Sequence, residues 1–267
     1  MLTRIFENQL ALGFAQAAVA AVLALAVVLL ARRWQISLER ETTVALLRGF
    51  VQVVLVGSVL LLLLQGPVWT GVLVLLAMMV AAATIAGRRA QGIPGAFWVS
   101  FQGIAFGAGL VIVLMTFLGA IELAVSSLVP VGSMLIANAM KANSLALDRF
   151  RSEVDAHVGQ IEAALALGAE PKRLVAPYVQ ASVRASLIPA LDSLRSLGIV
   201  WIPGLMAGMI LSGEDPVYAA IYQFVVIAMI FAASGLTSVV STLLIRPRAF
   251  SPAMQLLLRP GDNAQQG

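Results

Sequence analysis

Long, unbroken apolar stretches dominate the pattern of hydrophobic and polar positions along the chain. A helix rises 1.5 Å per residue, so about 20 apolar residues cross the ~30 Å hydrocarbon layer of a bilayer. Stretches of this kind lie at residues 11–31, 43–64, 68–86, 97–118, 128–147, 194–211 and 217–245. The fifth is the most interrupted, because Asn138, Lys141 and Asn143 fall in its second half. The pattern predicts an all-α integral membrane protein with about seven transmembrane helices.

The composition agrees with a chain whose surface faces lipid over much of its area. The 267 residues are 60% hydrophobic and 11% charged, far from the usage of soluble domains. Cysteine is absent, which excludes a disulfide framework, a zinc–thiolate site and a thiol nucleophile. The single histidine, His157, leaves little material for a His-rich metal site. Residues 11–31 precede Arg32 and Arg33, whereas a cleavable signal has a shorter apolar core with its charge in front, so we interpret this stretch as a retained first helix.

The basic residues lie almost entirely on one predicted side of the membrane. With seven spans, that side holds the segments around 32–42, 87–93, 148–193 and 246–267, and every lysine and arginine except Arg4 falls there or at the adjacent span ends. The positive-inside rule then predicts an external N-terminus and a cytoplasmic C-terminus, with the chain in a plasma membrane. The same asymmetry explains the net charge of +4 without a nucleic-acid partner. The opposite side carries Glu7, Glu122, Glu214 and Asp215, either in solvated loops or as an anionic mouth for a cation path.

The longest connection, residues 148–193, differs in composition from the rest of the chain. Val154, Val158, Ile161 and Leu165 follow one another at steps of four, three and four, which places them on one face of a helix. Gly168 suits the left-handed position that ends a helix, and Pro171 suits the first turn of the next. We therefore predict an amphipathic cytoplasmic elbow, residues 153–175, between the fifth and sixth spans. Residues 1–250 would form a single permease domain and residues 251–267 a short cytoplasmic tail.

A short motif lies inside the elbow. The sequence Glu162-Ala163-Ala164-x3-Gly168-Ala169-x-Pro171 resembles the EAA-x3-G loop of ABC transporter permeases, a short helix that docks into a cleft of the ATPase subunit. A stiff helix in a groove transmits displacement better than a loop does. The usual Ile-x-Leu-Pro ending is missing, because Tyr178, Gln180 and Ala181 stand in its place. The chain thus departs from the importer pattern.

A second resemblance covers the stretch from about residue 119 to residue 245. The matching pieces are Ile121-Glu122, 130–140 with Asn138-Ala139-Met140, Leu167-Gly168-Ala169-x-Pro171-Lys172, Arg184-Ala185-x-Leu187-Ile188-Pro189, Asp192-Ser193, Gly198-x4-Pro203-Gly204-x-Met206-x-Gly208, Asp215-Pro216 and Tyr222-Gln223. This series resembles the FetB family of iron-export permeases, whose plant relatives act in aluminium tolerance. The resemblance implies export of a metal cation such as iron. It also implies a second copy of the chain and a separate FetA-like P-loop ATPase that binds the ATP and Mg.

The chain itself shows no nucleotide or cofactor motif. No Gly-x4-Gly-Lys-Ser/Thr sequence is present, so ATP hydrolysis is expected in the partner and no enzymatic activity in this chain. Polar and charged side chains near or within membrane spans are energetically costly, so those that are present often line a substrate path. The candidate contacts along such a path are Glu122, Asn138, Lys141, Asp192 and Asp215. Each also has an ordinary explanation, such as a headgroup contact, a snorkelling lysine, or an Asp192–Arg195 pair. No metal ligands are assigned.

Glycine and proline positions predict how the helices pack. Gly103-x3-Gly107 and Gly204-x3-Gly208 favour close approach of two helix backbones. Pro203 with Gly204 should bend the sixth span near mid-depth, as a gating kink or as a structural one.

Two rival functions stay open. A secondary transporter would need an internal repeat with broken helices in both halves, and the sequence shows neither a repeat nor a second interrupted helix to match the one at Pro203. A membrane-embedded enzyme would need a serine beside a base at membrane depth, but Ser133 and Lys141 are eight residues apart on one helix and His157 lies on the elbow.

Overall fold

The computed structural model describes residues 9–35, 39–64, 66–90, 93–251 and 255–258. The chain divides into two compact units, Met1–Gln65 and Gly66–Gly267, each described by itself below. The described secondary structure is helical apart from two isolated bridges, Leu197 with Trp201 and Phe250 with Leu256.

The first unit is a pair of long apolar helices, α1 (Gln9–Arg33) and α2 (Glu39–Leu64). Phe14 and Phe50 meet edge to face with ring centroids 6.0 Å apart. Large side chains such as Val22 and Leu29 are about two-thirds exposed within the chain, as expected of residues that face lipid.

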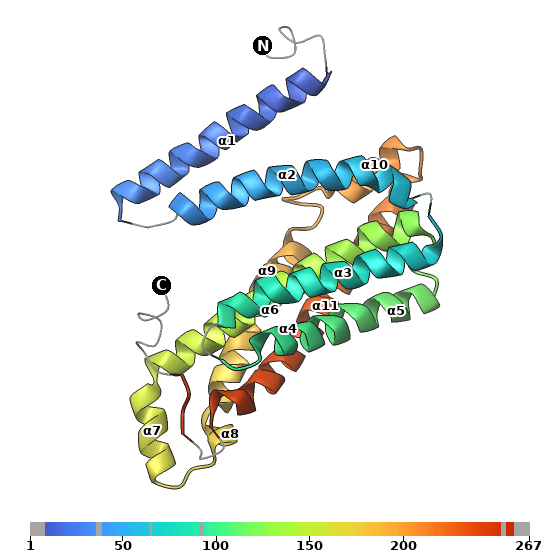
Figure 1. Ribbon diagram of the computed structural model, residues 1–267. Coiled ribbons are helices and arrows are strands. Elements are labelled where there is room, and N and C mark those ends of the chain that lie inside the picture. The colour runs from blue at the N-terminus through green and yellow to red at the C-terminus, as the bar shows by residue number, and fades with distance from the viewer. Residues whose placement is uncertain (1–8, 36–38, 65, 91–92, 252–254, 259–267) are drawn as a thin grey trace. The chain divides into compact units, whose positions relative to one another are not determined.

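The second unit is a helical bundle, whose helices can be followed in chain order in Figure 1. Its helices are α3 (Val68–Gly87), α4 (Ala96–Ile104), α5 (Leu110–Phe117), α6 (Val125–Ala156), α7 (Val158–Ala166), α8 (Pro171–Leu174), α9 (Ala176–Ser196), α10 (Gly204–Leu211) and α11 (Pro216–Ile245), with short 3-10 turns η2 (Arg88–Ala90) and η4 (Arg246–Ala249). The π-helical turn η3 (Ala105–Gly109) joins α4 to α5 in one span. α6 packs against α3, α9 and α11, and α11 also packs against α4.

The described helices confirm a multi-pass membrane protein. Six are long and apolar enough to cross a bilayer: Leu10–Arg33, Val68–Ala90, Ala96–Phe117, Val125–Ala156, Pro171–Ser196 and Pro216–Ala249. Thr42–Ser58 within α2 is a shorter apolar helix, so the total agrees with about seven spans. The predicted orientation stays a prediction.

The sixth span differs from the prediction. It was expected as one helix over residues 194–211, bent at Pro203, after a long connection over 148–193. In the structure α6 continues to Ala156, and α9 crosses the bundle from Ala176 to Ser196. The apolar pattern does not predict α9 as a span, because Arg184, Asp192 and several serines lower its mean hydropathy.

The predicted helix over 194–211 is broken. Residues 197–203 separate α9 from α10, with Gly198 at φ +77° and its N–H donating to the carbonyl of Trp201 at 3.0 Å. Pro203 has extended backbone (ψ 141°) and stands just before α10, so it ends an interruption rather than bending a continuous helix. Gly204 is the first residue of α10.

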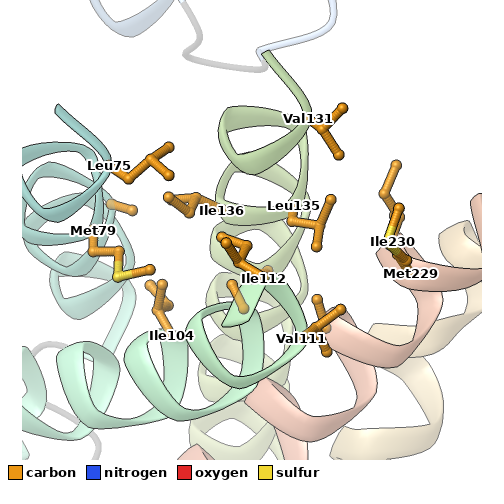
Figure 2. Close-up of a cluster of buried hydrophobic side chains, with 14 of the residues drawn as sticks. Leu75, Met79, Ile104, Val111, Ile112, Val131, Leu135, Ile136, Met229 and Ile230 are labelled. Carbon is orange, nitrogen blue, oxygen red and sulfur yellow. The ribbon is translucent and has the colours of Figure 1, made fainter. Parts of the chain in front are cut away.

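Two groups of buried side chains hold the second unit together. We call the first the bundle cluster; Figure 2 shows that α3, α4, α5, α6 and α11 all contribute to it. The second, the elbow cluster, gathers residues of α6, the elbow, the end of α11 and the C-terminal segment: Ala90, Ile93, Val99, Leu147, Phe150, Val154, Ile161, Val175, Val179, Ile245, Ala249, Leu256 and Leu258.

One of the two glycine pairs makes the predicted close contact. A Cβ built on Gly107 would lie 2.5 Å from the backbone nitrogen of Thr237, and Gly103 lies directly against Ser241. α4 and η3 therefore touch α11 backbone to backbone, as small residues allow. A Cβ on Gly204 or Gly208 would meet nothing within 4 Å in the described part of the chain, so that pair has no such contact there.

Candidate functional site

The elbow has the helix–turn–helix geometry that its sequence predicts. α6 ends at Ala156, the backbone turns at His157, and α7 begins at Val158. Gly168 has φ +84° and its N–H donates to the carbonyl of Leu165, while the N–H of Ala169 donates to that of Ala164. These two bonds form a Schellman motif, which closes α7. Pro171 then stands at the start of α8, where its missing N–H costs no hydrogen bond.

The two faces of α7 differ in exposure. Ile161 is 2% exposed and lies in the elbow cluster, with Val158 and Leu165 packed partly against it. Glu162, Ala163 and Ala166 lie on the exposed face, and the adjoining Leu167 is 90% exposed. Of the other motif residues, Gly168 is exposed, and Ala164, Ala169 and Pro171 are half-buried. The motif thus presents a small-residue surface with one protruding leucine.

The inner end of the elbow is stiffened by contacts around His157. The ring of His157 stacks on Tyr178 of α9 with centroids 4.9 Å apart, and Nδ1 lies 2.8 Å from the carbonyl oxygen of Glu153. Arg149 pairs with the carboxylate of Glu153 at 2.7 Å. These contacts connect the last turns of α6 to the first turn of α9.

The outer part of the elbow is held by the C-terminal region. Arg246 donates from Nη2 to the carbonyl of Lys172, and Arg248 donates from Nη1 to the carbonyl of Gly95 at 2.9 Å. Leu256 and Leu258 are 4% and 3% exposed in the elbow cluster. Residues 255–258, inside the predicted tail of 251–267, are therefore packed against the elbow; residues 252–254 and 259–267 lie outside the described part.

Two carboxylates predicted on the substrate path have local hydrogen bonds. Asp215 caps α11, accepting from the N–H groups of Val217 and Tyr218, both at 2.9 Å. Glu122, exposed in the connection between α5 and α6, accepts from the hydroxyl of Ser127 at 3.3 Å. The Asp215 contact is a helix cap, which stabilises α11 whatever else the carboxylate does.

The other three predicted path residues have similar surroundings. Asn138 donates to the carbonyl of Met134 at 2.8 Å, Lys141 is exposed, and Asp192 pairs with Arg195 at 3.7 Å. No hydrogen bond or ion pair in the described part of the chain joins any two of the five predicted path residues. Those described residues also hold no group of three Asp, Glu, His or Cys side chains able to hold a metal.

Sequence reasoning missed a set of buried hydroxyl side chains. α11 carries Ser234, Thr237, Ser238, Ser241 and Thr242, all buried. Their spacing of three, one, three and one places them on one face of the helix, a signal that was present in the sequence but hidden within an apolar run.

Comparison with known proteins places the chain in a family. A profile described as "Uncharacterised protein family (UPF0014)" matches residues 14–250. The chain belongs to the UPF0014 family. The UPF0014 membrane protein YjkA of Bacillus subtilis is 33% identical over 229 residues, or 85% of this chain and 91% of that relative.

Two further relatives carry descriptive names. "Protein ALUMINUM SENSITIVE 3" of Arabidopsis thaliana is 32% identical over 246 residues, 91% of this chain and 90% of the relative. "Probable iron export permease protein FetB" of Escherichia coli is 31% identical over 242 residues, 90% of this chain and 93% of the relative. No solved structure matches. The resemblance to the FetB family is thereby confirmed, together with membership of a membrane-protein family.

Proposed function

We propose that the chain is the membrane subunit of an ABC transporter that exports a metal cation such as iron. A separate P-loop ATPase would dock on the elbow and supply the energy. Two copies of the chain would form the permease in the plasma membrane, with the elbow on the cytoplasmic side. The similarity to FetB, which is named as an iron export permease, supports the substrate class.

The observation that carries the proposal is the build of the elbow. A coupling element must offer an exposed surface to a soluble partner and be fixed to the helices it moves. α7 meets the first condition through Glu162 and Ala163, together with the adjoining Leu167. It meets the second because Ile161 is buried in the elbow cluster with Phe150 of α6 and Ile245 of α11.

The charge distribution supports the same assignment. The elbow end of the second unit carries several of the predicted cytoplasmic arginines, among them Arg149, Arg151, Arg246 and Arg248. Arg195, which was predicted on the same side, lies instead at the far end of α9. A soluble ATPase that uses cellular ATP needs its docking surface on that side of the membrane.

The proposal is tested by purifying the tagged chain from its native membrane in mild detergent and identifying any P-loop ATPase that accompanies it. The variant Gly168→Val should abolish co-purification, because a β-branched residue is strained at φ +84° and would open the Schellman motif. Gly213→Val is the matched control: Gly213 has φ +97° just after α10, so it suffers the same backbone strain outside the elbow. A folded native chain that purifies without any ATPase would refute the proposal.

The alternative is an ion-coupled secondary transporter. The observation that favours it is the interruption at residues 197–203, between α9 and α10. Discontinuous helices are typical of ion and substrate sites in such transporters. Cation export from vesicles containing the chain alone, driven by an ion gradient without ATP, would decide for this alternative.

A further inference from the structure

A layer of buried polar side chains separates the two hydrophobic clusters of the second unit. On α4, Val99 belongs to the elbow cluster and Ile104 to the bundle cluster. On α6 the corresponding residues are Leu147 and Ala139, and on α11 they are Ile245 and Ala233. On α9, Val179 lies in the elbow cluster, and Leu194 packs against the bundle cluster.

Between these points every one of the four helices turns polar. We call the following residues the polar layer: Ser100 of α4; Asn143 of α6; Ser182 and Ser186 of α9; Ser234, Thr237, Ser238, Ser241 and Thr242 of α11. None is more than 2% exposed. Four helices thus contribute buried polar groups to the part of the bundle between the two clusters.

Contacts of three kinds connect residues of the layer to neighbouring helices. The hydroxyl of Ser186 donates to that of Ser238 at 3.0 Å, which links α9 to α11. Ser241 and Thr237 lie against Gly103 and Gly107, which links α11 to α4 and η3. Asn143 lies four residues from both Ala139 and Leu147, so it shares their face of α6, the face turned to the two clusters.

Several polar atoms of the layer have no partner in the described chain. They are Oγ of Ser100, Oδ1 and Nδ2 of Asn143, Oγ1 of Thr237 and Oγ of Ser241. Ser182 and Thr242, in contrast, donate to the carbonyls of Tyr178 and Ser238. A buried polar group without a hydrogen bond costs about 1–3 kcal/mol, so these atoms favour binding of a polar ligand, either water or an ion.

The chemistry of the layer selects the class of ligand. Its unpartnered acceptors are amide and hydroxyl oxygens of neutral side chains, which suit hard cations. No carboxylate belongs to the layer. Neutral oxygens bind a cation weakly. Weak binding suits a site on a transport path, because such a site must release its ion as readily as it accepts it.

We propose that the polar layer is an internal binding site for a hard cation that has shed much of its hydration shell, with the side-chain oxygen of Asn143 as a principal ligand. The part that this site plays in transport rests on the proposed function. The Gly103 and Gly107 contacts bring α4 and η3 against α11 beside the layer. The π-helical turn η3 adjoins that contact, and such turns are frequent at functional sites.

The test uses the purified full chain alone in lipid nanodiscs, with Mn²⁺ as the probe. The thermal unfolding midpoint is measured against MnCl2 concentration, with choline chloride keeping the ionic strength constant. A ligand that binds only the folded chain stabilises it by RT ln(1 + [L]/Kd), so the midpoint rises with the logarithm of the ligand concentration above Kd. Mn²⁺ should stabilise the native chain, and Asn143→Leu, of similar volume but without ligand atoms, should abolish the shift.

Two further variants sharpen the result. Asn143→Asp adds a carboxylate at the site, so it should lower the MnCl2 concentration that gives a fixed rise of the midpoint by about tenfold. Thr116→Val is the matched control, because the Thr116 hydroxyl is also buried and unpartnered but lies on α5, outside the layer. It should respond to Mn²⁺ as the native chain does.

Either of two results would overturn the proposal. One is the absence of any Mn²⁺-dependent shift in the native chain. The other is an unchanged shift in Asn143→Leu, which would place the ion elsewhere and leave the layer as a packing feature. Because the measurement needs no ATPase, its outcome is independent of the co-purification test, and the two proposals fail separately.

Discussion

The contact between η3 and α11 provides the sharpest test of the fold, through the substitution Gly107→Ala. The added methyl would lie 2.5 Å from the nitrogen and 2.8 Å from Cα of Thr237. These atoms belong to the backbone of α11, so no side-chain rotation relieves the clash and the two helices must separate. Overpacking of this kind costs about 1–3 kcal/mol, and a backbone neighbour places this case at the upper end.

The control lies in the same π-helical turn. A methyl on Gly109 would meet only Cε of Met79, at 3.5 Å, an ordinary contact with the flexible end of a side chain. Gly109→Ala should therefore change stability by less than about 1 kcal/mol. Unfolding of both variants by increasing the mole fraction of SDS in mixed micelles measures the difference. Equal stability of Gly107→Ala and Gly109→Ala would refute the close approach of η3 and α11.

Three other substitutions test the assignments made to single residues. Asp215→Ala should destabilise the chain by about 0.5–2 kcal/mol, because it removes the cap of α11. Asp215→Asn should keep the cap and the proposed cation export. Loss of export in the Asn variant would assign the carboxylate to the substrate path. Leu256→Ala should cost about 2–5 kcal/mol locally and speed proteolysis of the elbow, unlike Leu257→Ala, whose side chain is 38% exposed. Asp192→Ala should change the unfolding free energy by less than about 1 kcal/mol, because its pair with Arg195 is solvent-exposed; a larger effect in SDS unfolding would show a contact beyond that pair.

The elements that could be predicted from sequence are those fixed by local chemistry. Pro171 has a fixed φ, and Gly168 is the residue type that adopts a left-handed φ without strain, so the end of α7 and the start of α8 follow from the residues themselves. The apolar spans follow from bilayer thickness in the same way. Asp215 at the start of α11 is equally local, although its capping role was not predicted.

The parts that failed depend on tertiary surroundings. α9 crosses the bundle despite Arg184 and Asp192, because its serines Ser182 and Ser186 are buried among other helices rather than exposed to lipid. Hydropathy treats each residue as if it faced the solvent, so it cannot register a polar residue that neighbouring helices cover. Asn143, which appeared in the sequence only as an interruption of a span, is buried for the same reason.

The elbow cluster lies between the elbow and the polar layer. Ile161 of α7 belongs to this cluster, and so do Phe150 of α6 and Ile245 of α11. Phe150 is fully buried, and a close-packed interior transmits displacement because it has little free volume to absorb it. Ile245 lies one helical turn beyond Ser241, which in turn lies against Gly103. Under the proposed function, a partner that displaced α7 would therefore act through this packed cluster on the contact between Ser241 and Gly103 beside the polar layer.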